Sequence, residues 1–157
     1  LFFPGGNIGS LAVHGTVNDI SMAGAKPYYL TAGFIIEEGF PLSDLAEIVK
    51  SMAGAAKDAG VSIVTGDTKV VERGHGDGVF INTAGVGVVR DGLEICGDLA
   101  QPGTKILSSG TPGDHGVAVI SKRENLSLTT AILADSQELA DLGINHPHAV
   151  PDTHGVR

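Results

Sequence analysis

The chain has 157 residues, 42% of them hydrophobic and 18% charged, which is enough for one domain with a real core. Ten Lys and Arg against eighteen Asp and Glu give a net charge of −8, which argues against broad nucleic-acid binding but allows a small phosphorylated ligand. The single cysteine, Cys96, excludes an internal disulfide framework and is typical of a reducing, cytoplasmic compartment. No apolar run is long enough for a membrane span.

The first expected element is a helix over residues 8–23, because apolar residues recur there at helical spacing. Asn7 or Ser10 could cap its start, and residues 24–27, which include a glycine and a proline, supply a stop. Thr16 follows a glycine inside this helix and lowers its propensity. That pattern indicates close packing, a ligand contact or a simple irregularity.

A strand and a second helix follow. Residues 28–36 are rich in β-forming side chains and predict a strand. Residues 41–59 give the clearest helix of the chain, with one apolar face. We expect Ser43 to be its N-cap and Gly60 to lie just past its end.

The later elements are expected to be mainly strands. Residues 61–64 predict a strand that continues at residues 69–71 after a Gly-Asp-Thr turn. Residues 79–89 predict a long β segment, which we expect to pair with the strand before it as an antiparallel hairpin. A short strand over residues 105–108 and two helices, at 117–123 and 131–142, are expected next. Strands and helices alternate without a regular period, which favours an α+β fold over a doubly wound sheet.

Residues 64–71, VTGDTKVV, are the first candidate site. Here an apolar run reaches a glycine and is followed by Asp67, Thr68 and Lys69. A carboxylate and an ammonium two residues apart suit a metal–phosphate pair, because the carboxylate holds a hard cation and the lysine neutralises phosphate oxygens. A surface strand end with a solvated lysine explains the same residues equally well.

Asn18 and Asp19 form a second candidate, late in the first expected helix. An Asn-Asp pair that faces a cleft can supply two oxygen ligands to Mg²⁺, which needs only one or two carboxylates besides phosphates and water. By itself, however, the pair is better explained as a polar helix face.

The third candidate is the turn Gly113-Asp114-His115-Gly116, within a glycine-rich segment between an expected strand and an expected helix. Such a turn can bind an anion through the backbone N–H groups of the helix start. The Gly-Lys-Ser/Thr ending of a P-loop is missing, and an ordinary helix capped by Asp114 is an equally good explanation. Cys96 and the histidines, including a group near residues 146–154, are weaker candidates.

Beyond these local patterns, the chain resembles the HypE family of hydrogenase maturation proteins in the PurM-like ATP-binding superfamily. The resemblance covers about residues 1–149 and rests on segments that occur in order: LFFPGGNIGSLAVHGTVNDISMAGAKP, GFIIEEGFPLSDL, VTGDTKVV, INTAGVGVV and SGTPGDHGVAV. The fold that it implies is a PurM-like α+β N-terminal ATP-binding and dimerisation domain over residues 1–108. Its mixed or antiparallel sheet carries helices on one face, and residues 109–157 begin a second domain.

The resemblance also implies an activity. Members bind ATP with Mg²⁺, carry a carbamoyl group on a C-terminal cysteine and dehydrate this thiocarboxamide to a thiocyanate. The cyanide then passes to the iron of a [NiFe]-hydrogenase. The implied partners are a second copy of the chain, a HypF-type carbamoyltransferase and the HypC–HypD scaffold.

Carried over residue by residue, the resemblance makes Asp19 and Asp67 magnesium ligands, with Asn18 beside the metal. Lys69, with Thr68 next to it, matches a catalytic lysine at the phosphates. Gly113, Asp114 and His115 match a Gly-Asp-His-Gly turn that contributes to cofactor binding.

Parts of the family pattern are missing. The terminal cysteine is absent and Cys96 does not replace it, the upstream Asp-Ser/Thr-Phe strand is not present, and residues 148–156 diverge. We therefore expect a fragment cut at both ends that is inactive alone. Two alternatives remain: another kinase or synthetase of the superfamily, such as a selenophosphate synthetase or a thiamine-phosphate kinase, and a non-catalytic dimerising domain.

Overall fold

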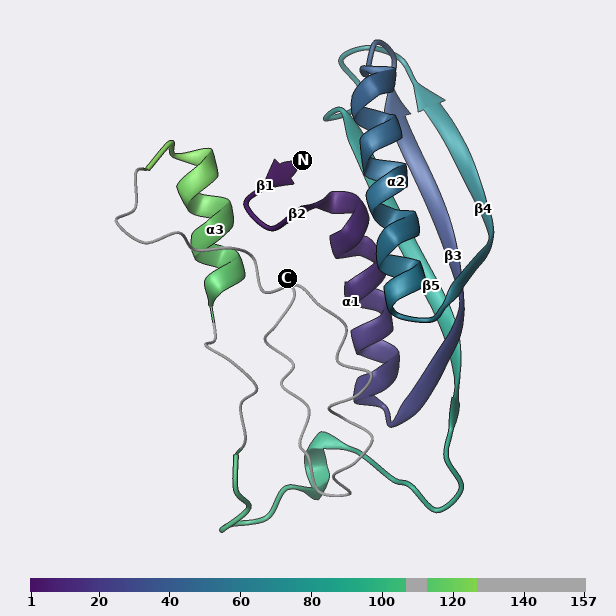
Figure 1. Ribbon diagram of the computed structural model, residues 1–157, viewed down its shortest axis with the longest axis vertical. Coiled ribbons are helices and arrows are strands. Elements are labelled where there is room, and N and C mark those ends of the chain that lie inside the picture. The colour runs from purple at the N-terminus through teal and green to yellow at the C-terminus, as the bar shows by residue number, and fades with distance from the viewer. Residues whose placement is uncertain (107–112, 127–157) are drawn as a thin grey trace.

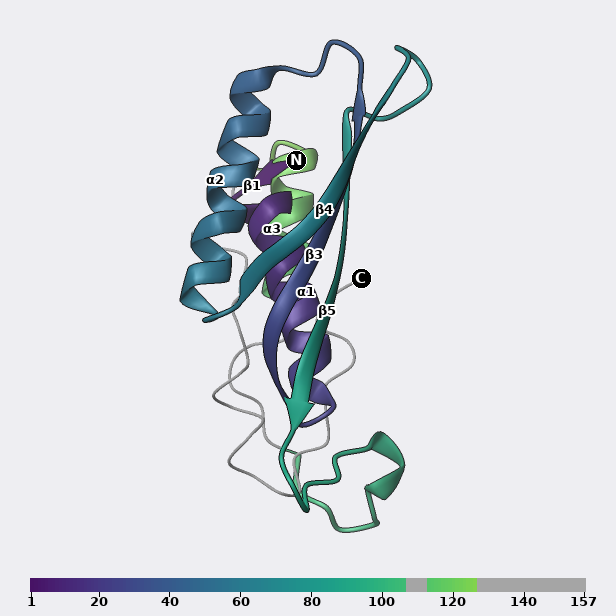
Figure 2. The ribbon, with the colours of Figure 1, turned by 90° about the vertical axis from the view of Figure 1, so that its right-hand side faces the viewer.

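The computed structural model describes residues 1–106 and 113–126. Two short strands, β1 (Phe2–Phe3) and β2 (Gly6–Asn7), precede the helix α1 (Ile8–Met22). The core then consists of β3 (Ala25–Glu37), α2 (Leu42–Asp58), β4 (Ser62–Val71) and β5 (Val79–Val89). A 3₁₀ turn at Gly97–Leu99 and the helix α3 (Asp114–Arg123) follow. Both α1 and α2 lie on the same face of the sheet (Figures 1 and 2).

Helix α1 begins where the sequence predicts, and both expected caps take part. The Asn7 side chain accepts hydrogen bonds from the backbone N–H groups of Gly9 (2.8 Å) and Ser10 (3.4 Å), while the Ser10 hydroxyl lies 3.2 Å from the Asn7 backbone nitrogen. Together these bonds form a capping box, which satisfies backbone donors that the first helical turn leaves unpaired. At the other end, Gly24 has a φ of +74°, as a helix stop requires.

The start of α2 differs from the expectation. Pro41 occupies the N-cap position, and no side chain caps the helix. Ser43 already lies inside the first turn, and its hydroxyl donates to the Asp44 carboxylate at 3.2 Å. Ser43 was therefore the wrong cap, because the fixed φ of proline starts the helix two residues earlier. The expectation for Gly60 is confirmed by its φ of +66°.

The central sheet is mixed, with the strand order β4-β3-β5. β4 pairs with β3 in parallel, and β5 pairs with the other edge of β3 in antiparallel fashion. The expected β4–β5 hairpin is therefore wrong: α2 returns the chain to the beginning of β3, and β4 and β5 end on opposite sides of that strand. The mixed sheet with helices on one face, and the α+β class, are confirmed.

β4 is also longer than predicted. Gly66, Asp67 and Thr68 form no turn, because they pair in register with Ala32, Gly33 and Phe34 of β3. The irregularity of the ladder falls earlier, between Leu30 and Thr31 of β3. Likewise, β3 begins at Ala25 rather than at residue 28, and Pro27 is accommodated beside a shift in the β5 ladder.

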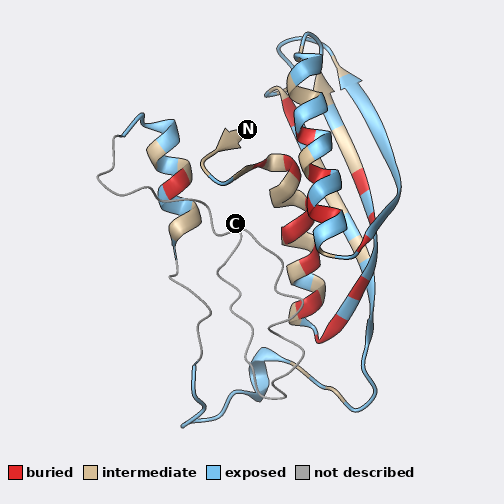
Figure 3. Ribbon diagram, viewed as in Figure 1, coloured by how far each residue is buried: buried red, intermediate tan, exposed pale blue. Residues whose placement is uncertain are grey.

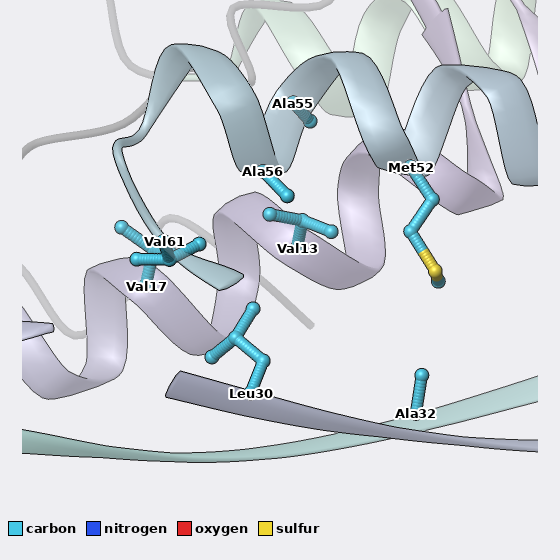
Figure 4. Packing of buried hydrophobic residues seen from close by; sticks show 8 residues of the cluster. All are labelled: Val13, Val17, Leu30, Ala32, Met52, Ala55, Ala56 and Val61. Atoms are coloured by element: carbon cyan, nitrogen blue, oxygen red, sulfur yellow. The ribbon is translucent and has the colours of Figure 1, made fainter. Parts of the chain in front are cut away.

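The hydrophobic core lies between the two helices and the sheet (Figure 3). Figure 4 shows Val13 and Val17 of α1 facing Ala56 of α2 and the nearby Val61, with Leu30 below them on β3. Leu30 is completely buried. Full burial of such a side chain contributes roughly 2 kcal/mol of transfer free energy, so this layer anchors both helices to β3.

The last described elements only partly match the prediction. α3 begins at Asp114, three residues before the expected helix start. Residues 105 and 106 belong to no strand, and residues 107–108 of that expected strand lie outside the described residues. The expected helix over residues 131–142 and the histidines near residues 146–154 also lie outside them.

Candidate functional site

The VTGDTKVV stretch lies along β4, where Asp67, Thr68 and Lys69 are all exposed. One oxygen of the Asp67 carboxylate, Oδ1, accepts a hydrogen bond from the Thr68 backbone N–H at 2.8 Å. This bond orients the carboxylate and leaves Oδ2 available to a cation. Since β4 is an edge strand of the described sheet, the stretch is accessible from outside.

The three side chains are not all on one face of the sheet. Asp67 pairs with Gly33 and Lys69 pairs with Ile35, whose side chain is 45% exposed on the face that no described helix covers. Thr68 instead pairs with Phe34, which packs against the hydrophobic core. Because side chains alternate along a strand, Asp67 and Lys69 share the open face, whereas Thr68 faces the helices.

Gly66 allows β4 to approach β3 closely at this point. A Cβ atom added to Gly66 would lie 2.0 Å from the Ala32 carbonyl oxygen, far inside contact distance. Ala32 belongs to the core and cannot easily move. The glycine before Asp67 is therefore required by the strand pairing itself, and its position fixes where Asp67 emerges.

A groove of about 620 Å³ runs between α2 and β4. One side has apolar side chains, including Val49 and Met52 from α2 and Phe34 from β3, and the other is formed by residues 63–68 of β4. Thr68, whose side chain faces α2, and Asp67 are both among the residues that line this groove. The groove is shallow and open to solvent, so by itself it does not identify a ligand site.

Asn18 and Asp19 lie in the second half of α1, where Asn18 is half-buried and Asp19 is exposed. Thr16 and Ile20 of the same helix contact β5, while Gly9 contacts α2. Asp19 is exposed to solvent, and α1 packs mainly against α2, β5 and β3, whereas Asp67 lies on β4. β5 and β4 flank β3 on opposite sides, about 10 Å apart.

The structure therefore does not bring Asp19 and Asp67 into one cluster within this chain. Among the described residues, no group of three or more His, Cys, Asp or Glu side chains could hold a metal ion. Such a donor set fits an ion that is bound largely by phosphate oxygens and water, as Mg²⁺ commonly is, and does not fit a closed metal cage.

The third candidate, Gly113-Asp114-His115, forms the start of α3. Gly113 precedes the helix with a φ of +100°, a conformation that favours glycine, and Asp114 lies in the first turn. The His115 ring packs edge-on against Phe3 of β1, with 5.3 Å between the ring centroids. This turn is therefore next to the β1–β2 hairpin, and the three candidate sites lie on three different elements.

No local sequence pattern indicates a partner for Glu37, at the end of β3. In the structure its carboxylate accepts hydrogen bonds from the backbone N–H groups of Gly74 and Gly78, the latter at 3.1 Å. The Gly74 and Gly78 bonds, with smaller contributions from Arg73 and His75, lower the pKa of Glu37. Glu37 thereby holds the loop between β4 and β5 against the end of β3.

Sequence reasoning also missed a contact between α1 and β5. The hydroxyl oxygens of Thr16 and Thr83 lie 2.7 Å apart, although the two residues are 67 positions apart in the chain. The only signal was Thr16 itself, whose low helix propensity indicated close packing as one explanation. Cys96, by contrast, is exposed beside the 3₁₀ turn. No helix in the part of the chain that the structure describes could span a membrane.

Comparison with known families defines the class of this fold. Residues 1–89, more than half of the chain, match the domain described as AIR synthase related protein, N-terminal domain. The chain belongs to this family. A thiamine-monophosphate kinase from Stenotrophomonas maltophilia has the same fold, with a TM-score of 0.72 over 90% of this chain and 48% of its own, at only 22% identity.

Within the family, the chain is similar to HypE proteins. Carbamoyl dehydratase HypE from Cupriavidus necator is 64% identical over all 157 residues, which cover 45% of that relative. A structure of a HypE–HypF complex matches 92% of this chain and 47% of its own with a TM-score of 0.89 and 61% identity. HypE in complex with ATP matches 91% of this chain and 43% of its own, with a TM-score of 0.88 and 52% identity.

The resemblance to HypE inferred from the sequence is thus confirmed. The chain spans about half the length of the curated relatives that it matches, since it covers 46% of the Azotobacter vinelandii carbamoyl dehydratase HypE, for example. The similarity in fold therefore does not by itself assign the activity, substrates or partners of a whole HypE protein to this chain.

Proposed function

We propose that this chain is the ATP-binding part of a HypE-type carbamoyl dehydratase, which acts in the cytoplasm during [NiFe]-hydrogenase maturation. The observation that carries the proposal is the similarity to HypE over the whole chain, at 64% identity, together with the match to an ATP-bound HypE structure. The placement of Asp67 and Lys69 on one accessible face of β4 supports it, because a carboxylate and an ammonium there can meet a metal-bound triphosphate.

In this proposal Lys69 is the catalytic lysine and stabilises negative charge on the phosphoryl group that is transferred. Asp67 and Asp19 are ligands of Mg²⁺ held chiefly by phosphate oxygens, with Asn18 and Thr68 close to them. Because Asp19 and Asp67 lie apart, each would serve a different position of the nucleotide–metal complex. Mg²⁺ would neutralise the charge of the phosphates.

The proposed chemistry explains why ATP is needed. In a thiocarboxamide the oxygen bound to carbon is a poor leaving group. Transfer of the γ-phosphoryl group to that oxygen creates a good leaving group. Breaking the C–O bond then releases phosphate, and loss of the two nitrogen-bound protons leaves the thiocyanate. The net change is the removal of water from the thiocarboxamide at the cost of one ATP.

A second copy of the chain is the proposed partner at the open face of the sheet. Tyr29, Phe80 and Val86 are 52%, 52% and 61% exposed, on the face opposite to α1 and α2. Exposed apolar residues gathered in this way mark an association surface. A HypF-type carbamoyltransferase is a further proposed partner, supported by the HypE–HypF complex of a relative, and the HypC–HypD scaffold would receive the product.

The domain division remains part of the proposal. Residues 1–108 would form the N-terminal ATP-binding and dimerisation domain, and residues 109–157 would begin the C-terminal domain. The Gly113-Asp114-His115 turn would then approach the nucleotide from that second domain. The family match over residues 1–89 supports the first half of this division.

The proposal can be tested on the full-length protein with its terminal cysteine carbamoylated. Cyanide formation is measured after addition of Mg²⁺ and ATP, for the wild type, Lys69→Ala and Lys50→Ala. Lys50 is an exposed lysine on α2 and serves as the matched control. We expect Lys69→Ala to reduce the rate at least about 100-fold, the scale for loss of one electrostatic contact to a transition state, and Lys50→Ala to leave it unchanged.

Three results would contradict the proposal. An unchanged rate in Lys69→Ala would remove the role assigned to that lysine. A wild-type protein that phosphorylates a small substrate but forms no cyanide would instead favour a kinase or synthetase of the superfamily, such as a thiamine-phosphate kinase or a selenophosphate synthetase. Dimerisation without any ATP binding would indicate a non-catalytic domain.

A further inference from the structure

Side-chain hydrogen bonds, in addition to apolar contacts, join α1 to β5. The Thr83 hydroxyl donates to the Ala12 carbonyl oxygen at 2.9 Å. Since the Thr83 proton is used in that bond, the Thr16 hydroxyl supplies the proton for the 2.7 Å contact between the two hydroxyl oxygens. The Thr16 hydroxyl also makes a longer hydrogen bond to the Thr83 carbonyl oxygen, at 3.4 Å.

The strand is shaped around the helix beside this hydroxyl pair. Gly85 and Gly87 follow Thr83 on the helix-facing side of β5, and an added Cβ at either would come within 2.7 Å or less of Ile20. Thr83, Gly85 and Gly87 therefore form a track of small side chains along which Thr16 and Ile20 lie. These small residues allow α1 to lie close to β5. The hydroxyl pair then determines the position of α1 along the strand and its rotation about its own axis.

This restraint matters for the residues that follow Thr16. Val13 and Val17 make apolar contacts, which tolerate a small rotation of the helix about its axis, whereas hydrogen bonds do not. Asn18 and Asp19 lie two and three residues after Thr16, less than one helical turn away. Any rotation that the hydroxyl pair prevents would displace the Asp19 carboxylate, which lies on the outside of α1.

We propose that the Thr16–Thr83 hydroxyl pair positions Asn18 and Asp19 for binding of a magnesium–nucleotide complex. The inference deepens the proposed function and rests on it. Thr16 and Thr83 touch neither the nucleotide nor the metal; they act through the orientation of α1 and are positioning residues. Residues that orient metal ligands in this way commonly change metal affinity by about 10- to 100-fold when they are replaced.

The test uses the full-length protein and measures ATP affinity by calorimetry at several Mg²⁺ concentrations, below the unfolding temperature of each variant. Thr83→Val keeps the shape of the side chain but removes the hydroxyl, and Thr83→Ser keeps the hydroxyl. Ser21→Ala is the matched control, because within the described residues the Ser21 hydroxyl of α1 donates to the Val17 carbonyl of its own helix, at 2.8 Å, and makes no bond to β5.

We expect Thr83→Val to weaken Mg²⁺-dependent ATP binding about tenfold and to change metal-free binding much less. Thr83→Ser and Ser21→Ala should bind as the wild type does. Thr16→Val should weaken binding in the same direction, and the double variant Thr16→Val with Thr83→Val should be no worse than Thr83→Val alone, because the bond between the two hydroxyls is already lost in that variant.

Failure of the proposed function and failure of the positioning role would give different results. If the wild type showed no Mg²⁺-dependent ATP binding, the proposed function would be overturned, and the positioning role with it. If the wild type bound the complex and Thr83→Val and Thr16→Val bound it equally well, only the positioning role would be overturned. A loss in Thr83→Val that equals the loss in Ser21→Ala would also overturn it, because general destabilisation would then explain both.

Discussion

The two sides of the central strand β3 are built differently. On one side, β5 packs against α1 through paired hydroxyls and through glycines that leave no room for a side chain beside Ile20. On the other side, β4 is exposed along almost its entire length and carries the charged residues Asp67 and Lys69. The two sides therefore differ in role. The β5 side holds α1 rigidly, the β4 side exposes charged side chains, and β3 pairs with both strands.

The largest loss of stability is expected at Gly66, where β4 pairs closely with β3. Gly66→Val places side-chain atoms against the Ala32 backbone, and even the Cβ would lie 2.0 Å from its carbonyl oxygen. We expect a loss of about 3 kcal/mol or more in the free energy of unfolding, measured by urea denaturation. Gly54→Ala, in α2 with open space around it, is the control and should be neutral or slightly stabilising. Equal stability of Gly66→Val and wild type would show that β4 pairs with β3 in another way.

The second prediction tests whether the buried side chains of β3 anchor the helices to the sheet. Leu30→Ala removes a completely buried side chain from the layer between the helices and the sheet. We expect a loss of about 3 kcal/mol in urea denaturation, from lost transfer free energy and the cavity that remains. Val70→Ala on β4, where the side chain is 59% exposed, should cost less than about 1 kcal/mol. Similar losses for both variants would contradict the described burial.

A smaller loss of stability is expected at the N-terminus of α1. Asn7→Ala removes the side-chain acceptor of the α1 capping box and should cost about 1 kcal/mol. Ser43→Ala should cost less than about 0.5 kcal/mol, because Ser43 caps no helix and is exposed. Thermal unfolding followed by circular dichroism can compare the two. A larger effect for Ser43→Ala would restore it as the cap of α2.

The smallest expected effect concerns the pH dependence of the loop that joins β4 to β5. The Gly74 and Gly78 bonds lower the pKa of Glu37 below its ordinary value of 4.5, so the ionised carboxylate is favoured in the folded state. Its stabilising contribution is therefore present above that ordinary value and is lost as the pH falls through the lower folded pKa. Unfolding free energies of wild type and Glu37→Gln should differ at neutral pH and converge in acid. A constant difference down to strongly acidic pH would contradict this assignment, and Glu38→Gln serves as the control.

The sequence predicted the parts of the fold that depend on local patterns. Apolar periodicity and the Asn7–Ser10 pair located α1, and Gly60 located the end of α2. The pairing of the strands was not predictable in this way. Gly66-Asp67-Thr68 has the composition of a turn, and only the partner residues Ala32 to Phe34 on β3 make it a strand.

The same limit applies to the candidate site. Composition and resemblance identified Asp19, Asp67 and Lys69, but the face that each presents depends on register and helix rotation. The separation of Thr68 from Asp67 and Lys69 follows from pairing with β3. The Thr16–Thr83 pair joins residues that are distant in sequence, and no local pattern connects them.

The most direct test of the central claim is the Mg²⁺-dependent binding of ATP to the full-length protein, measured by calorimetry for wild type, Asp67→Asn and Asp77→Asn. Asp77 is an exposed aspartate in the loop after β4 and controls for a general change of charge. We predict that Asp67→Asn weakens binding about tenfold or more, the scale of one lost charge-assisted interaction, and that Asp77→Asn has no effect. Equal binding by wild type and Asp67→Asn would contradict the assignment of β4 as the strand that presents the nucleotide site.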